Sequence, residues 1–516
     1  MKKESIKEVI TMSKNLFGII YMSSLKVKLT IFDLKNMNIL EEVDSAEFIP
    51  HNSQTNIYTQ ELSKITLALN GFKQLLKDYH VQSFRFFGNK QLLDDVSARY
   101  IADQIFVRTN LKISWLNTGQ VNFFKAQAVI GQLQALNDTT YETTYLLSLG
   151  SNFITIFEFH DNKFKTVWNI EFGQHELNDI QQALRLTAND STEVINDYIK
   201  SKLESLKNIF PKTSGKVRLV LQHSVALRNK FIKSTETTAE ISIGEFQKIY
   251  HDIINNTDQY LTNSFAIDDN RLSRVIPHFL IVNRIIKLLK VDTLMLTTLS
   301  VTEGLALQQA IDNGFVTADF SEMILTSAQN IANRYLTDNR HRMNVKKFAL
   351  HLFDQLKRLH HLTTRHRLLL QIACEVDDIG NFINPKGHYR HSAYILEANK
   401  IIGLSDNENQ IIAEISRYHS SESPEIDQHH YQHLDDDIQM IVAKLAAILR
   451  IADALDDSHN QKIKKISISL KEEQLIISAF CNQDLTLEKW SFTQKAPLFK
   501  EVFGIEPVFK QRRVRN

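Results

Sequence analysis

Glycine is scarce in this chain, and its scarcity excludes two common kinds of phosphate-binding loop. The 516 residues contain 15 glycines, roughly 3% against a usual ~7%. The closest pair is Gly380 and Gly387. Neither GxGxxG nor GxxxxGK[S/T] can therefore occur, so neither a Rossmann dinucleotide site nor a P-loop is expected.

The chain also has few cysteines, no long apolar run and almost no net charge. The two cysteines, Cys374 and Cys481, form no CxxC pair, which argues against a zinc ribbon or a disulfide framework and favours a reducing, cytoplasmic location. No run approaches the ~20 apolar residues of a membrane span, and neither membrane contact nor an export signal is expected. Sixty Lys and Arg against 59 Asp and Glu give a charge of +1, so no specific nucleic-acid site is expected.

The first third of the chain alternates between strand and helix patterns. Residues 25–34 and the ILEEV that follows predict a hairpin, and residues 59–78 predict a helix. Residues 145–173 repeat the pattern of strand, turn and strand, and their TIFE (155–158) echoes TIFD at 30–33. The echo predicts a duplicated half-domain, and coincidence between two alternating strands is the alternative.

The rest of the chain is rich first in helix patterns and then in strands. Long amphipathic helices are expected up to about residue 460, and the one that includes CEVDDIG is predicted to stop at Gly380. From residue 464 the pattern returns to alternating strands. We therefore expect domains at 1–130, 131–315, 316–462 and 463–516.

Several stretches resemble the exopolyphosphatase/guanosine pentaphosphate phosphatase (Ppx/GppA) family. They are FALHLFDQLKRLH (348–360), VDDIGNFINPKGHYRHSAYIL (376–396), LAAILRIADALDDSH (445–459), DLTLEKWSFTQKAPLFKEVFG (484–504) and, more weakly, residues 270–307. The resemblance implies two actin-like (ribonuclease-H-type) α/β halves, an HD-type helical domain and a small C-terminal α/β piece. It also implies hydrolysis of a terminal phosphoanhydride of polyphosphate or pppGpp with Mg²⁺, in a cleft between the halves, where a catalytic Glu orients the attacking water.

The phosphate-binding and catalytic motifs of that family are degenerate here. Its DIGSNSxR corresponds to residues 21–28, its DIGGGSTE to 148–155, and its LGxVR to 172–176. Its SGxEEA falls near residues 118–123, so the catalytic Glu falls near Val121. The remaining candidate phosphate contacts are Ser23, Ser24, Lys26, Gly150, Ser151 and Asn152. Because Mg²⁺ needs hard oxygen ligands and the attacking water needs an oriented acceptor, we expect a scaffold without the family's hydrolytic activity.

The resemblance to HD-type domains also places candidate metal ligands in the helical region. They are His341, Asp377, Asp378, His391, His419 and Asp453. Asp377 stands where the HD motif has His, a change that would favour a harder ion such as Mg²⁺ or Mn²⁺. Two adjacent carboxylates near the negative end of a helix dipole need a cationic neighbour. We expect that neighbour to be His391, His419 or Arg417, with a bound metal as the alternative.

Two functions remain open from the sequence. The first is a non-catalytic protein that binds polyphosphate or a guanosine phosphate, forms a homodimer or pairs with an active paralogue, and regulates polyphosphate metabolism. The second is an enzyme, either a diverged exopolyphosphatase or a phosphohydrolase that uses the HD-type site. The basic C-terminus with Lys510, Arg512, Arg513 and Arg515 is either a solvated end or a contact for a polyanion.

Overall fold

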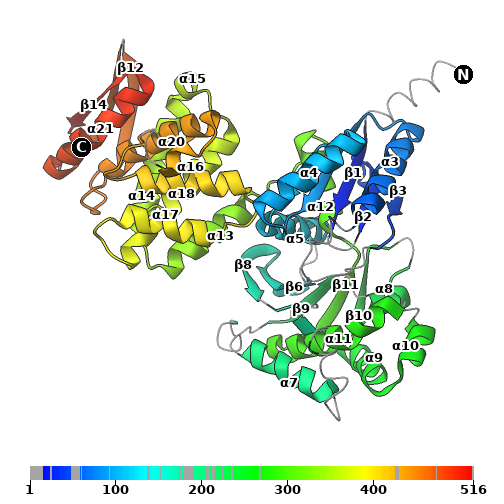
Figure 1. The fold of residues 1–516 in the computed structure, drawn as a ribbon. Coiled ribbons are helices and arrows are strands. Elements are labelled where there is room, and N and C mark those ends of the chain that lie inside the picture. The colour runs from blue at the N-terminus through cyan, green and yellow to red at the C-terminus, as the bar shows by residue number, and fades with distance from the viewer. Residues whose placement is uncertain are drawn as a thin grey trace, which may run out of the picture. The chain divides into compact units, whose positions relative to one another are not determined.

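The structure, a computed structural model, divides the chain into two compact units (Figure 1). Unit 1 spans Met1–Phe320 and unit 2 spans Ser321–Asn516. The structure describes residues 15–23, 26–47, 59, 61–91, 93–135, 140–150, 153–170, 172–173, 176–177, 180, 191–204, 210, 215–222, 225–233, 236–265, 269–424, 429–471 and 473–513. Among these residues, no helix combines the length and apolarity that crossing a membrane requires.

The first α/β half of unit 1 is built on one mixed sheet. Its elements are β1 (Leu16–Met22), β2 (Val27–Asp33), β3 (Asn38–Asp44), α3 (Leu62–Asp78), β4 (Ser83–Asn89), α4 (Asp95–Thr109), β5 (Ile113–Leu116) and α5 (Thr118–Ala135). The strand order is β3-β2-β1-β4-β5, with β1, β2 and β3 antiparallel and β4 and β5 parallel to β1. The hairpin predicted from residue 25 is β2 and β3, and the helix predicted over 59–78 is α3.

The second α/β half repeats this arrangement around a six-stranded sheet. Its elements are β6 (Thr143–Leu149), β7 (Ile154–His160), β8 (Lys163–Ile170), α7 (Ser191–Glu204), β9 (Val217–Gln222), α8 (Val225–Phe231), β10 (Thr238–Ser242), α9 (Ile243–Asn255), α10 (Asp258–Phe265), α11 (Asp269–Leu289), β11 (Thr293–Thr297) and α12 (Val301–Asp312). Strands β8-β7-β6-β9-β11 have the order and directions of β3-β2-β1-β4-β5, and β10 adds an antiparallel edge. The predicted fold, two actin-like halves of ribonuclease-H type, is confirmed.

The four-residue echo lies on equivalent strands, although its register differs between the halves. TIFD (30–33) lies on β2 and TIFE (155–158) lies on β7. After the turn, the first pairs are Met22 with Val27 in one half and Leu149 with Ile154 in the other. The echo therefore begins three residues into β2 and only one residue into β7. A shift of two residues keeps each side chain on the same face of its sheet, so the alternating pattern survives the difference.

Helix α12, which ends the second half, completes the core of the first half. Alternation along β1 places Ile20 and Met22 on the face that α3 and α4 cover, and Phe17 and Ile19 on the opposite face. There Phe17 and Ile19 pack with side chains of α5 and α12. A Cβ on Gly304 would lie 2.0 Å from the Phe124 carbonyl oxygen, so α12 can approach α5 this closely only with glycine at this position.

Unit 2 is helical and ends in a small three-stranded sheet. Its elements are α13 (Ser321–Arg334), α14 (Asn339–Gln355), α15 (Lys357–His360), α16 (Thr364–Val376), η2 (Ile379–Phe382), α17 (His388–Ala398), α18 (Asp406–Tyr418), α19 (His429–Gln432), α20 (Asp436–Ala454), β12 (Lys465–Lys471), β13 (Gln474–Phe480), α21 (Thr486–Phe503) and β14 (Glu506–Arg512). The sheet order is β12-β13-β14. The predicted change from helices to strands is confirmed.

The prediction that the helix stops at Gly380 is wrong in its position. Helix α16 ends at Val376, with Asp377 as its C-cap. Gly380 lies in the short helix η2, where a Cβ would lie 2.0 Å from the His388 carbonyl oxygen and 2.4 Å from the Ser392 amide nitrogen. Glycine is therefore required here for the close packing of η2 on α17, and not as a helix stop.

Candidate functional site

The strand ends of unit 1 lack the carboxylates that a magnesium site needs. Ligands of open α/β sheets bind outside the carboxyl ends of the strands, which here belong to β1, β4, β5, β6, β9 and β11. The last two residues of each of these strands and the residue that follows include no Asp or Glu. Mg²⁺ in proteins is held by carboxylates. The residues present at these strand ends therefore do not fit the Mg²⁺ that the resemblance implies.

Val121, near which the resemblance places the catalytic Glu, is a core residue. Helix α5 begins just before it, where the Gln120 amide donates to Asn117 Oδ1 at 2.9 Å. The Val121 side chain is 4% exposed and packs in one cluster with Phe17 and Ile19. An apolar side chain cannot accept a proton from water, and a carboxylate in this cluster would be desolvated.

Lys125 follows one helical turn after Val121 and brings a positive charge to the end of β6. Its Nζ donates to Ser148 Oγ at 2.9 Å, and Ser148 stands where DIGGGSTE has its Asp. Burial lowers the pKa of Lys125 to about 8. Among the described residues, no carboxylate lies within ion-pair distance of this ammonium group. A side-chain cation thus lies beside a position where the family has an acid.

The candidate phosphate-binding turns retain little that would hold an anion. Ser23 Oγ donates to the Lys26 carbonyl oxygen at 3.0 Å and accepts from the Lys26 amide at 3.1 Å. The Lys26 ammonium group pairs with Asp44. The Gly150 amide donates to the Phe153 carbonyl oxygen at 2.9 Å. The other predicted contacts lie outside the described residues; they are Ser24, Ser151 and Asn152.

In unit 2, His341 bridges the carboxylates of Asp453 and Asp456, which follow it in the sequence by more than a hundred residues. Its Nδ1 lies 3.0 Å from Asp456 Oδ2, and its Nε2 lies 3.1 Å from Asp453 Oδ1 and 3.9 Å from Asp378 Oδ2. Burial alone would lower the pKa of His341, but the hydrogen bonds to Asp453 and Asp456 raise it to about 11. His341 is therefore an imidazolium that donates to two carboxylates.

Asp378 lies between two further imidazoles. Its Oδ1 is 3.3 Å from His388 Nε2 and 3.6 Å from His419 Nε2, and these two ring nitrogens are 3.2 Å apart. Burial would lower the pKa of His419, but its hydrogen bond to Asp378 and the charge of Asp377 raise it to about 9. Burial and the charge of His419 lower the pKa of His388. One charged and one neutral imidazole therefore flank Asp378.

The other predicted members of this site have different surroundings. Asp377 is 5% exposed, and burial raises the pKa of its carboxyl group. Arg417 pairs with Glu397 and Glu414. His391 contributes no atom to the groups of potential metal ligands found among the described residues. The histidine beside Asp378 from the same helix is instead His388, at the first position of α17.

Lys495 is the cation on Asp453, and the sequence analysis missed it. Its Nζ contacts the Asp453 carboxylate and lies 3.6 Å from Asp457 Oδ1. One turn earlier on α21, Ser491 Oγ donates to Asp457 Oδ1 at 2.7 Å. Burial would raise the pKa of Asp453, but Lys495 and His341 hold it well below its usual range. The only signal in the sequence was the spacing of Ser491 and Lys495, which places both on one face of α21.

Two overlapping groups of side chains in this cluster have the composition of a divalent-cation site. The ligand atoms of Asp378, His388 and His419 lie within 4.8 Å of one another, and so do those of Asp378, His341 and His459. Mixed imidazole and carboxylate donors suit Mn²⁺ better than Mg²⁺. A divalent ion held here would act as a Lewis acid toward a phosphoryl oxygen.

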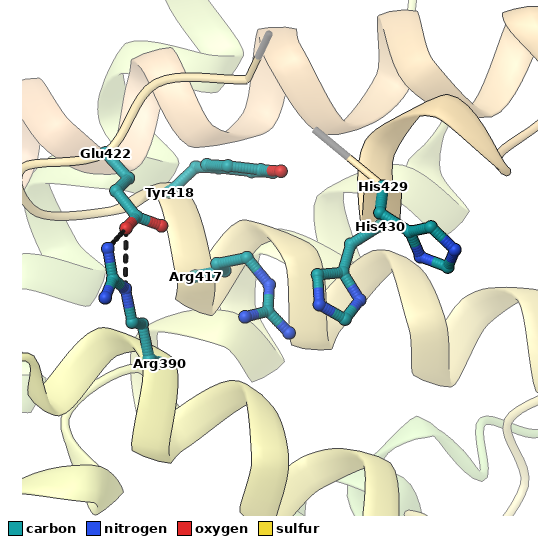
Figure 2. A pocket seen from close by; sticks show the side chains of 6 residues that line it. All are labelled: Arg390, Arg417, Tyr418, Glu422, His429 and His430. Carbon is teal, nitrogen blue, oxygen red and sulfur yellow. Dashed lines mark hydrogen bonds and ion pairs between the residues drawn. The ribbon is translucent and has the colours of Figure 1, made fainter. Parts of the chain in front are cut away.

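A pocket of about 410 Å³ opens between α17, α18 and α19 of unit 2 (Figure 2). It is lined by Arg390, Arg417, Tyr418, Glu422, His429 and His430. Arg390 pairs with Glu422 on one side, the two histidines lie on the other, and Arg417 lies between them. Two guanidinium groups and two imidazoles therefore line the pocket with one carboxylate.

The fold and these sites together define a protein with two actin-like halves and a helical unit that contains a histidine-aspartate cluster. Residues 325–498 match the family model described as Ppx/GppA phosphatase, domain III. Residues 325–498 thus carry domain III of the Ppx/GppA family, and the predicted resemblance is confirmed for this part of the chain.

Solved structures with similar folds include members of the same family. A Ppx/GppA protein of Aquifex aeolicus is 12% identical, with a TM-score of 0.47, over 58% of this chain and 98% of that one. An exopolyphosphatase of Cytophaga hutchinsonii is 15% identical, with a TM-score of 0.48, over 58% and 98%. The ethanolamine utilization protein EutJ of Carboxydothermus hydrogenoformans is 10% identical, with a TM-score of 0.27, over 56% and 88%.

Proposed function

We propose that this chain is a non-hydrolytic member of the Ppx/GppA family that acts by binding. Its ligand would be polyphosphate or a guanosine phosphate, and its protein partner a second copy or an active paralogue. The observation that carries the proposal is the burial of Val121, near which the resemblance places the catalytic Glu, in the apolar core of the first half. The absence of acids from the strand ends of unit 1 supports it, because the reaction needs both a metal ligand and a water acceptor.

The remaining charge at the strand ends suits binding better than hydrolysis. Lys125 offers a cation that, among the described residues, no carboxylate neutralises, and a phosphate oxygen would satisfy it. A lysine attracts phosphate without any metal ion, but it does not activate water for attack. The two free, buried cysteines agree with a reducing compartment, and we place the protein in the cytoplasm.

Phosphate release from long-chain polyphosphate and from pppGpp tests the proposal. With Mg²⁺ or Mn²⁺ present, the chain should act at least ~10³-fold more slowly than a family member with intact motifs, because the carboxylates and the catalytic Glu are missing. A rate within about tenfold of that homologue would refute the proposal. Retention of the chain on immobilised polyphosphate, weakened by Lys125→Met, is the expected positive result.

A phosphohydrolase that uses the cluster in unit 2 is the second candidate, and the ligand set around Asp378 favours it. Asp378, His388 and His419 would hold the ion, and His341 lies on the other oxygen of Asp378. Release of phosphate that requires Mn²⁺, is lost in Asp378→Ala and persists in Lys125→Met would place this candidate first. Stoichiometric Mn²⁺ in protein purified without added metal would agree with it.

A further inference from the structure

The pocket between α17, α18 and α19 has the size of a site for a small molecule, and two guanidinium groups that could contact phosphate lie in its wall. Its volume of about 410 Å³ lies within the roughly 300–1,000 Å³ of small-molecule sites and exceeds what one phosphate group fills. Four of its six lining residues carry a guanidinium or an imidazole (Figure 2). Guanidinium groups bind phosphate oxygens in pairs and keep their charge at any physiological pH.

Arg390 provides the accessible half of the site. Its side chain is 64% exposed, and both its Nε and one terminal nitrogen contact the same oxygen, Oε1 of Glu422. A guanidinium has five N–H donors, so this pair leaves donors of Arg390 that a ligand can use. The Glu422 carboxylate marks where an anionic oxygen sits on Arg390.

Arg417 provides the fixed half of the site. Its side chain is 11% exposed and lies 2.9 Å from Glu397 Oε1 and 3.3 Å from Glu414 Oε2. These two contacts hold the guanidinium in place between Arg390 and His430 (Figure 2). Burial raises the pKa of Glu414 and so weakens it as a counter-charge to Arg417. Both guanidinium groups of the pocket therefore have internal carboxylate partners, and the Glu397 and Glu414 carboxylates that fix Arg417 also lie near His430.

We propose that this pocket binds the phosphate chain of an inorganic oligophosphate or a nucleoside triphosphate, and that Glu422 competes with this chain for Arg390. Phosphate oxygens contact Arg390 and Arg417 from the two sides, and the imidazoles of His429 and His430 donate to the chain from α19. The site is independent of the strand ends of unit 1, because it consists entirely of residues of unit 2.

Two substitutions with opposite expected effects test the proposal on the full chain. Calorimetric titration at fixed salt with inorganic tripolyphosphate, and separately with ATP, should show binding that Arg390→Gln weakens at least about fivefold, through loss of a charged donor. Glu422→Gln should tighten binding at least about threefold, because it removes the competing carboxylate. Arg358→Gln on α15, an exposed arginine outside the pocket, should leave the affinity unchanged.

The remaining outcomes decide against the site or name its ligand. The proposal is overturned if neither the wild type nor Glu422→Gln binds either probe up to about 1 mM. A melting temperature of Glu422→Gln equal to that of the wild type would show that the variant is folded. Binding that Lys125→Met abolishes and Arg390→Gln leaves intact also overturns it and assigns the anion to unit 1. If the expected pattern appears with both probes, the phosphate chain alone is recognised, and if it appears with ATP alone, the ligand is a nucleotide.

Discussion

The strand ends of unit 1 and the histidine-aspartate cluster of unit 2 differ in whether acidic side chains are present. At the strand ends of unit 1 the acids are absent, and Lys125 has no carboxylate partner among the described residues. In the cluster of unit 2 the acids are present, and Lys495 and His341 neutralise Asp453. In both places a side chain carries the positive charge that a metal ion would supply. A covalently attached cation has a fixed position, but it brings no coordinated water, so under the proposed function charge complementarity is kept without hydrolysis.

Removal of the Lys495 ammonium group should cause the largest loss of stability, and it tests whether this lysine neutralises the acids of unit 2. Lys495→Met leaves Asp453 buried without its main counter-charge, which should lower the free energy of unfolding by about 3–5 kcal/mol. Urea denaturation measures this loss. In a double-mutant cycle, adding Asp453→Asn should recover part of it, because the uncompensated charge is then gone.

The matched control for Lys495 lies on the same helix. Lys500 pairs with Glu506, and its side chain is 63% exposed, so Lys500→Met should cost less than about 0.5 kcal/mol. Equal losses for Lys495→Met and Lys500→Met would show that the cluster does not depend on its lysine. A rise in the melting temperature of Lys495→Met alone on addition of Mn²⁺ would show that the lysine and the ion are alternatives.

Placing a Glu at position 121 should not restore phosphate release, and this substitution tests the comparison at unit 1. Val121→Glu places a carboxyl group among Phe17, Ile19 and their neighbours, and it should cost about 3 kcal/mol of stability without yielding phosphate release. Val121→Leu, which keeps the site apolar, should cost less than about 1.5 kcal/mol. A stable Val121→Glu protein that releases phosphate from polyphosphate would show that only this side chain is missing.

The buried ammonium group of Lys125 should make the free energy of unfolding change with pH between about 8 and 10.5. Its pKa of about 8 lies below the ordinary value of 10.5, so between these values the unfolded chain binds more protons and stability rises with pH. Lys125→Met lacks this penalty and should be more stable than the wild type at pH 7, by about 1–3 kcal/mol. The advantage should disappear towards pH 10.5, as measured by urea denaturation across the range. A variant that is less stable at pH 7 would mean that an acid neutralises Lys125.

Patterns that are local in the sequence predicted most of the fold. The hairpin of β2 and β3, the helix α3 and the strands β12 and β13 follow from alternation and helical spacing. The duplication was also visible, because TIFD and TIFE lie on equivalent strands. The register of the echo could not be predicted. Pairing starts at Met22 with Val27 in one half and at Leu149 with Ile154 in the other, which is the same separation along the chain, and period-two patterns are unchanged by a shift of two.

The site was predicted only where the family motif supplied positions. His341, Asp378, His419 and Asp453 were named in advance and lie together. Lys495 was missed because only the packing of α21 on α20 brings it to Asp453. His388 and His391 are equally plausible in the sequence, and the helix start at His388 decides which ring reaches Asp378.

The contact of α12 with α5 has a consequence for how the chain is made. The ribosome delivers the first half complete by residue 135, but one face of its sheet is covered only in part, by α5, until residues 301–312 have emerged. During the synthesis of more than 160 intervening residues, the cluster of Phe17 and Ile19 lacks its α12 side chains and is exposed to chaperones and to misassembly. The first half therefore cannot fold to completion during translation ahead of the second, and a chain truncated before Val301 is expected to aggregate even though each strand of its first sheet is present.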